Sequence, residues 1–249
     1  MKRAGSPRSR EWFRDWFGEE YLALYPHRDD KEAGQAVRLF LRAVPPDGLV
    51  LDLACGAGRH ARELSVSGVP VIGLDLSSTL LGEARKAEPD LSLVRADMRD
   101  LPFADCSFGG LTSFFTSFGY FGTQTEDRRV IDHIRRVLAP GGTFMLDFFN
   151  ATRVREQLVP HDVRWFEDQR VTQTRDIEGD MVVKRIVIEP RDLSSPVQEF
   201  EERVRLYDPA ELDALLREAR LETEYTFGDY GGADFVAGSE RLILAGRAV

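Results

Sequence analysis

Residues 48–150 alternate short apolar runs with longer helical patterns. The runs, which are typical of strands, lie at 50–53, 69–74, 91–96, 110–114 and 143–148. One helix is predicted to open after residue 58 and another to span 125–138. Strands that alternate with helices in this way predict βαβ units and an α/β fold.

Two helices are predicted ahead of this stretch. The first covers 9–26, where aromatic and large apolar side chains form a wide apolar face. We expect Trp12 and Trp16 in the core. The second covers 30–43, begins at the acidic pair Asp29-Asp30 and stops at Pro45-Pro46.

Beyond Asn150 the apolar pattern changes to the period of strands. Half-buried strands are predicted at 163–165, 171–174, 182–188 and 200–206, with a turn at 178–180 between the middle pair. We interpret 160–206 as an antiparallel insertion over one end of the sheet. Asp208-Pro209 caps a helix that runs to about Arg220. Strands near 221–228 and 240–248 complete a seven-stranded sheet.

The first strand leads into a glycine-rich turn, Asp52-Leu53-Ala54-Cys55-Gly56-Ala57-Gly58. Glycine gives such a turn backbone angles that other residues avoid, and its missing side chain lets a ligand lie against the main chain. The second strand ends in Asp75, where a carboxylate can bind ribose hydroxyl groups. The two turns together predict an adenosine site.

Two classes of cofactor bind to a strand–turn–helix–strand unit of this kind. Residues 56–61 match the dinucleotide fingerprint with alanine in its third place, and a dinucleotide sets its pyrophosphate over the helix N-terminus. Asp52 is unfavourable beside a pyrophosphate but favourable near a ligand with an ammonium and a sulfonium. The loop therefore favours S-adenosylmethionine over NAD.

The next two strands add candidate contacts. Asp97 follows the third strand, where a carboxylate can accept a hydrogen bond from an adenine amino group while Met98 packs on the ring. The fourth strand leads into an aromatic stretch with Phe115, Phe118 and Tyr120. Tyr120 either faces the methyl acceptor or packs with Phe118 and Phe121. No Asn-Pro-Pro-Tyr follows this strand, so the recognisable signature of base-nitrogen methylation is missing.

The composition of the chain limits the classes of partner that can be expected. The formal net charge is −9, which argues against nucleic acid because phosphate binding needs basic clusters. No stretch approaches the roughly 20 apolar residues of a membrane span. Cys55 and Cys106 have no metal or redox spacing, and neither do the histidines. We expect no metal, no membrane partner, a reduced cytoplasmic setting, and a monomer or homodimer.

Several motifs in order resemble the class I S-adenosylmethionine-dependent methyltransferases. They are the loop Asp52–Gly58, the turn Gly73-Leu74-Asp75-Leu76-Ser77, Arg95-Ala96-Asp97-Met98 and Leu138-Ala139-Pro140-Gly141-Gly142. Ala54 departs from the pattern, which often has glycine there. The resemblance implies a Rossmann-like, three-layer, seven-stranded sheet, here with an antiparallel β insertion. It also implies four segments: an N-terminal helical lid (1–45), a cofactor-binding core (46–150), the insertion as substrate cover (151–207) and a C-terminal completion of the sheet (208–249).

The resemblance also indicates site residues. The expected cofactor-binding set is Tyr21, Tyr25, Arg28, Asp52, Ala54, Cys55, Gly56, Gly58, Asp75, Leu76, Asp97, Met98 and Phe115. Phe118 and Tyr120 are expected at the substrate, with Tyr120 orienting the acceptor or relaying a proton. Arg59 reaches either the cofactor's carboxylate or a surface acid, and His60 is either a ligand contact or a structural histidine.

The favoured function is S-adenosylmethionine-dependent methyl transfer to a small-molecule nitrogen, oxygen or carbon nucleophile, achieved mainly by positioning and desolvation. The alternatives are a methyltransferase that acts on protein or RNA, and a non-catalytic adenosyl-binding or NAD-type protein. Residues 160–206 either cover the acceptor pocket or form a dimer surface.

Overall fold

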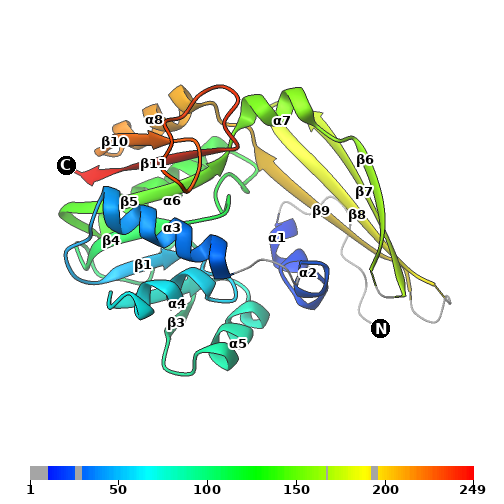
Figure 1. Ribbon diagram of the computed structural model, residues 1–249, viewed down its shortest axis with the longest axis horizontal. Coiled ribbons are helices and arrows are strands. Elements are labelled where there is room, and N and C mark those ends of the chain that lie inside the picture. The colour runs from blue at the N-terminus through cyan, green and yellow to red at the C-terminus, as the bar shows by residue number, and fades with distance from the viewer. Residues whose placement is uncertain (1–10, 26–29, 167, 192–195) are drawn as a thin grey trace.

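The computed structural model describes residues 11–25, 30–166, 168–191 and 196–249. For these residues, Figure 1 shows a core sheet covered by helices and a second sheet that extends to one side of this core. The core sheet has the strand order β10-β11-β5-β4-β1-β2-β3. Its strands are β1 (Val50–Leu53), β2 (Val71–Asp75), β3 (Ser92–Arg95), β4 (Phe108–Ser113), β5 (Leu138–Phe149), β10 (Leu221–Phe227) and β11 (Arg241–Ala248).

Strands β1 to β5 are parallel to one another, and β11 runs antiparallel to both β5 and β10. The predicted α/β fold with a seven-stranded sheet and an added antiparallel sheet is therefore confirmed. Because the parallel strands share one direction, the loops that follow β1, β2, β3 and β4 meet at the same edge of the sheet.

Helices cover both faces of the core sheet. Val50 of β1 packs with α3 (Asp30–Ala43) and α4 (Arg59–Val66) on one face. Leu51 belongs to the cluster on the other face, with α6 (Gln124–Val137) and α8 (Pro209–Glu218). Successive strand residues point to opposite faces, so a strand such as β1, which is buried at every position, requires a helix layer on each side. Helix α5 (Ser78–Ala87) contacts β2 and β3.

The second sheet follows α7 (Ala151–Gln157), a short helix that the sequence analysis did not predict. Asn150 caps it by accepting hydrogen bonds from the Thr152 and Arg153 amides. The four strands are antiparallel and adjacent in chain order: β6 (His161–Phe166), β7 (Gln169–Glu178), β8 (Met181–Pro190) and β9 (Gln198–Arg205).

The predicted N-terminal helix over 9–26 is wrong in its continuity. The chain instead forms α1 (Trp12–Trp16) and α2 (Glu19–Leu24), with Gly18 as the extended N-cap of α2. In Figure 1 both short helices lie between the core and the second sheet, and α1 contacts β9. Trp12 and Trp16 are buried, as expected.

Strand β5 begins earlier than predicted. Phe108 of β4 pairs with Leu138, whereas Gly110 pairs with Thr143, so four residues of β5 stand opposite one residue of β4. Gly141 takes a φ of 74° within this irregular segment. The Pro140-Gly141-Gly142 part of the motif noted in the sequence is therefore a bulge inside β5.

Gly58 and Gly68 provide a matched test of the packing behind the glycine-rich loop. Both have a φ of 80°, but a Cβ at Gly58 would lie 2.9 Å from the Ala84 Cβ, while one at Gly68 would meet nothing within 4 Å. Gly68→Ala should cost about 1–2 kcal/mol of unfolding free energy through backbone strain. Gly58→Ala should cost about 1–3 kcal/mol more through overlap with α5. Equal losses in chemical denaturation of the two variants would contradict this packing role.

Candidate active site

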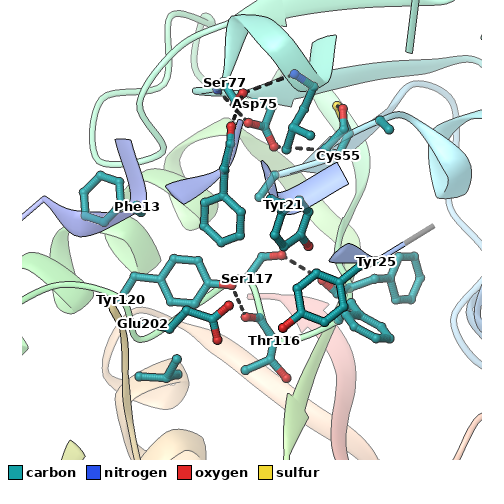
Figure 2. Close-up of a pocket in the computed structure, with 18 of the residues that line it drawn as sticks. Phe13, Tyr21, Tyr25, Cys55, Asp75, Ser77, Thr116, Ser117, Tyr120 and Glu202 are labelled. Atoms are coloured by element: carbon teal, nitrogen blue, oxygen red, sulfur yellow. Dashed lines mark hydrogen bonds between the residues drawn. The ribbon is translucent and has the colours of Figure 1, made fainter. Parts of the chain in front are cut away.

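A pocket of about 1310 Å³ opens at the edge where the loops after β1, β2, β3 and β4 meet. Helices α1 and α2 form another wall, and side chains of the second sheet close the far side. Figure 2 shows Asp75 at one end and Glu202 of β9 at the other, with Tyr21 between them. The pocket thus spans three separate parts of the chain.

The glycine-rich loop has three residues in the left-handed region. Ala54 has a φ of 58°, Gly56 of 56° and Gly58 of 80°. Beyond the adjoining residues of the chain, the nearest atom to a Cβ on Gly56 would be the Leu80 Cδ1 at 3.8 Å, so the space above this residue is open to a ligand. Gly58 lies instead against α5. The two glycines therefore have different roles, one at the pocket and one in helix packing.

Asp75 joins the loops that follow β1 and β2. Its Oδ2 accepts from the Gly56 amide at 2.9 Å, and its Oδ1 accepts from the Ser77 amide at 2.8 Å (Figure 2). Burial raises the pKa of Asp75, although these backbone hydrogen bonds oppose the shift. The carboxyl group keeps further acceptor sites for a ligand, because two oxygens offer about four lone pairs.

Asp97, at the end of β3, is held by Arg99. The guanidinium donates to both carboxylate oxygens, at 3.1 and 2.7 Å, and also to Glu11 and Glu126. Burial raises the pKa of Asp97, but the hydrogen bonds and charge of Arg99 outweigh burial and lower it overall. Asp97 and Met98 both line the pocket, so the loop is fixed in place before any ligand arrives.

Asp52 lies beneath the loop rather than on the pocket wall. Its side chain is 1% exposed, and the Thr112 hydroxyl donates to Oδ1 at 3.0 Å. Burial raises the pKa of Asp52 to about 7 despite this bond. Asp52 can therefore act on a bound ligand through its charge, without touching it.

The N-terminal helices are tied to both ends of the pocket. The Ser77 hydroxyl donates to the Phe17 carbonyl at 2.6 Å beside Asp75. At the opposite end, the Trp16 indole donates to Glu202 at 2.6 Å. Trp12, Phe13, Phe17, Tyr21 and Tyr25 all line the cavity between these points.

The second sheet contributes an ion pair to the pocket wall. Lys184 of β8 lies 2.6 Å from Glu202 of β9 and donates to the Tyr25 hydroxyl at 2.9 Å. Burial lowers the pKa of Lys184, but the neighbouring Glu202 charge and Tyr25 raise it overall, so the lysine stays protonated. This end of the pocket is polar and charged, in contrast to the aromatic middle.

Most of the predicted site residues come together in this pocket. Those that line it are Tyr21, Tyr25, Ala54, Cys55, Gly56, Asp75, Leu76, Asp97, Met98, Phe115 and Tyr120. Arg28 lies outside the described residues. Phe118 does not fit the expectation that it faces the substrate, because it is buried and its ring stacks on Tyr207, 5.8 Å between centroids. Arg59 lines the pocket and pairs with Glu32, and His60 packs on Phe114.

Sequence reasoning missed several pocket residues. Lys184 and Glu202 sit opposite one another in the β8–β9 register, on the face that also carries Val182 and Val204. The alternation of side chains along β8 and β9 indicated that these residues share a face of the sheet, but the sequence did not show which face meets the core. Arg241 of β11 also lines the pocket, and no local motif marks it.

Within the part of the chain that the structure describes, no group of three or more histidine, cysteine or acidic residues is arranged to hold a metal ion. Over the same residues, no helix is long and apolar enough to cross a membrane.

A family model described as a methyltransferase domain matches residues 50–142. The dTDP-3-amino-3,4,6-trideoxy-alpha-D-glucopyranose N,N-dimethyltransferase of Streptomyces venezuelae is 28% identical over 227 residues, 89% of this chain and 92% of that protein. A solved S-adenosylmethionine-dependent methyltransferase from Clostridium acetobutylicum superimposes with a TM-score of 0.78 at 18% identity, covering 91% of this chain and 95% of that one.

Residues 50–142 match a methyltransferase domain, and the chain shares the fold of S-adenosylmethionine-dependent methyltransferases. The expected enzyme class and the cofactor S-adenosylmethionine are confirmed. A second relative, the dTDP-4-amino-2,3,4,6-tetradeoxy-D-glucose N,N-dimethyltransferase of Saccharopolyspora spinosa, is 28% identical over 213 residues, 83% of this chain and 84% of that protein.

Asp52 makes the stability of the methyltransferase depend on pH. Its pKa is about 7 in the folded state and about 3.9 in an unfolded chain. Between these values the folded state holds a proton that the unfolded chain releases, so the free energy of unfolding falls as pH rises toward 7. Asp52→Asn keeps the acceptor for Thr112 and removes this titration.

The advantage of Asp52→Asn over the wild type should therefore grow from about pH 5 to about pH 8, by on the order of 2–4 kcal/mol. Chemical denaturation of both proteins across this range measures it. A constant difference between the two would contradict a raised pKa at Asp52.

Proposed function

We propose that this enzyme binds S-adenosylmethionine at the β1–β3 end of the pocket and methylates an amine of a small polar acceptor held against the second sheet. The observation that carries the proposal is the continuity of the cavity, which reaches from Asp75 and Gly56 to Lys184 and Glu202. Its volume of about 1310 Å³ exceeds the roughly 300–1,000 Å³ of a typical single-ligand site. Both reactants therefore fit at the same time.

The residues at the first end suit an adenosine. Gly56 leaves room for a ligand against the main chain, and Asp75 has free acceptor capacity for ribose hydroxyl groups. Asp97 and Met98 flank the position expected for the adenine ring. Asp52 lies buried below the loop with a pKa of about 7, and its ionised form favours a cationic ligand over a pyrophosphate.

When bound, the cofactor supplies an electrophilic methyl group on a sulfonium. The protein then has to align a nucleophile and exclude water. Trp12, Phe17 and Tyr21 enclose the middle of the cavity with apolar surface. The Tyr120 hydroxyl donates to the Thr116 carbonyl at 2.5 Å, which fixes the ring beside the loop after β4 (Figure 2). This arrangement supports positioning as the main source of rate.

Glu202 supports an amine as the acceptor. Its carboxylate accepts from Trp16 and Lys184, and two of its roughly four lone-pair sites remain for N–H groups of a ligand. The Streptomyces venezuelae and Saccharopolyspora spinosa relatives are named as N,N-dimethyltransferases of amino sugars. We infer the same bond type here, without a specific sugar. The four-segment division, the cytoplasmic setting and the choice between monomer and homodimer stay predictions.

Asp75→Asn tests the cofactor end. The asparagine side chain keeps the size of the aspartate. Its single oxygen cannot accept hydrogen bonds from the Gly56 and Ser77 backbone amides and from a ribose hydroxyl at once, so affinity for S-adenosylhomocysteine should fall about tenfold or more. Calorimetry measures this, with Asp100→Asn as control because Asp100 is an exposed acid after β3. Unchanged affinity in Asp75→Asn, or wild-type binding of NADH in place of S-adenosylhomocysteine, would sink the assignment.

Glu202→Gln tests the acceptor end. With labelled S-adenosylmethionine and a panel of dTDP-amino sugars, the variant should lose about tenfold or more in kcat/KM, corresponding to roughly 1.4 kcal/mol, while S-adenosylhomocysteine still binds. Glu201→Gln is the matched control, because Glu201 faces the other side of β9, where it pairs with Arg185 and Arg203. Equal losses in the two variants, or label transfer only to hydroxyl acceptors, would refute the amine proposal.

A further inference from the structure

Two consecutive residues at the pocket mouth have an uncommon backbone conformation. Phe115 and Thr116 follow β4 directly and have φ values of 61° and 58°. Both line the pocket. This left-handed region is unfavourable for a side chain with a Cβ and most unfavourable for a β-branched residue such as threonine. Strain of this kind persists only where neighbouring groups enforce it, and it gathers at functional sites.

Asp147 of β5 is the group that enforces the conformation. Its side chain is fully buried. The Phe115 amide donates to its Oδ2 at 2.5 Å, and the Thr116 amide donates to its backbone carbonyl at 3.0 Å. One residue therefore fixes two successive N–H groups of the turn.

Asp147 is itself fixed by two side chains from the C-terminal part of the chain. The Tyr230 hydroxyl donates to Oδ2, and the Arg241 guanidinium donates to both oxygens, at 2.9 Å to Oδ2. Arg241 also lies over the Phe115 ring, 5.2 Å from its centroid, and Arg59 lies 4.6 Å from the same centroid. The strained turn is thus held through its main chain and through its aromatic side chain.

The turn presents oxygen atoms to the cavity. The Thr116 carbonyl accepts from the Tyr120 hydroxyl and keeps a second lone pair. The loop after β4 lies next to the one after β1, because these strands are neighbours in the sheet. On the cofactor placement proposed above, Thr116 and Tyr120 stand where the sulfonium methyl group leaves. Oxygen atoms attract polarised C–H groups weakly and N–H groups strongly.

We propose that Asp147 is a positioning residue for methyl transfer. It holds Phe115 and Thr116 in the left-handed conformation, so that the Thr116 carbonyl and the Tyr120 hydroxyl face the transferred methyl group. This inference rests on the proposed cofactor site and adds a residue that does not line the pocket. Tyr230 and Arg241 act through Asp147 in the same assembly.

A pair of cofactor analogues tests the proposal without a known acceptor. S-adenosylhomocysteine lacks the methyl group, whereas sinefungin carries an amine in its place. The ratio of their dissociation constants therefore measures contacts at the methyl position alone. In Asp147→Asn, an NH₂ donor replaces one of the two acceptor oxygens, so either the Arg241 Nε at Oδ1 or the donors at Oδ2, which include the Phe115 amide, lose their acceptor. The dissociation constant of sinefungin should rise at least threefold relative to that of S-adenosylhomocysteine, while the affinity for S-adenosylhomocysteine itself changes less.

A matched pair of milder variants covers the case in which Asp147→Asn does not fold. Tyr230→Phe removes one hydrogen bond to Asp147, and Tyr207→Phe removes an equivalent bond to Asp127, another buried acid that also pairs with an arginine. Tyr230→Phe should shift the ratio at least threefold, and Tyr207→Phe should shift it less than that. Isothermal titration of both analogues measures all four proteins, with the wild type as reference.

The outcomes separate the two proposals. A ratio shift below threefold in Tyr230→Phe and in any folded Asp147→Asn, including equal weakening of both analogues, overturns the positioning role. An equal shift in Tyr207→Phe overturns it too, because the effect would then follow from any lost buried hydrogen bond. Failure of the wild type to bind S-adenosylhomocysteine overturns the proposed function itself.

Discussion

Residues 11–25 hydrogen-bond to the loop after β2 and to the second sheet, and they line the pocket between these two parts. Phe17 accepts from Ser77 beside the cofactor end, and Trp16 donates to Glu202 on the second sheet. The break at Gly18 lets α1 and α2 take different directions, so their aromatic side chains reach both ends. A single straight helix over these residues would present one stripe to one surface.

Buried acids organise the loops at the ends of the strands. Asp75 and Asp147 each accept from backbone amides of a neighbouring loop, and Asp52 accepts from Thr112. Burial of a carboxyl group is unfavourable unless donors surround it. For Asp75 and Asp147 the donors include amides of loops that line the pocket, so the bonds that satisfy these two acids also shape the cavity. Asp52 has the fewest donors of the three, and burial leaves its pKa at about 7.

The parts of the molecule that could be predicted depend on local patterns. The parallel strands, the glycine-rich loop and the capping box at Asp208 and Glu211 each carry their signal within a few residues. The contacts of Asp147 with Tyr230 and Arg241 join residues more than 80 positions apart, so no window of the sequence contains them. The break at Gly18 was missed because the aromatic spacing continues across it. Phe118 was misplaced because an aromatic residue near a site motif also suits the core.

The bridging position of α1 and α2 has a consequence for the order of events in turnover. Opening the cavity at the cofactor end requires loss of the Ser77 bond, and opening it at the acceptor end requires loss of the Glu202 bond. Because both bonds end on one short segment, an acceptor that strengthens the contacts at Glu202 also slows the escape of the cofactor. On the proposed placement, the two reactants are thereby linked energetically through this segment as well as through their direct contact, and the linkage acts equally in both directions.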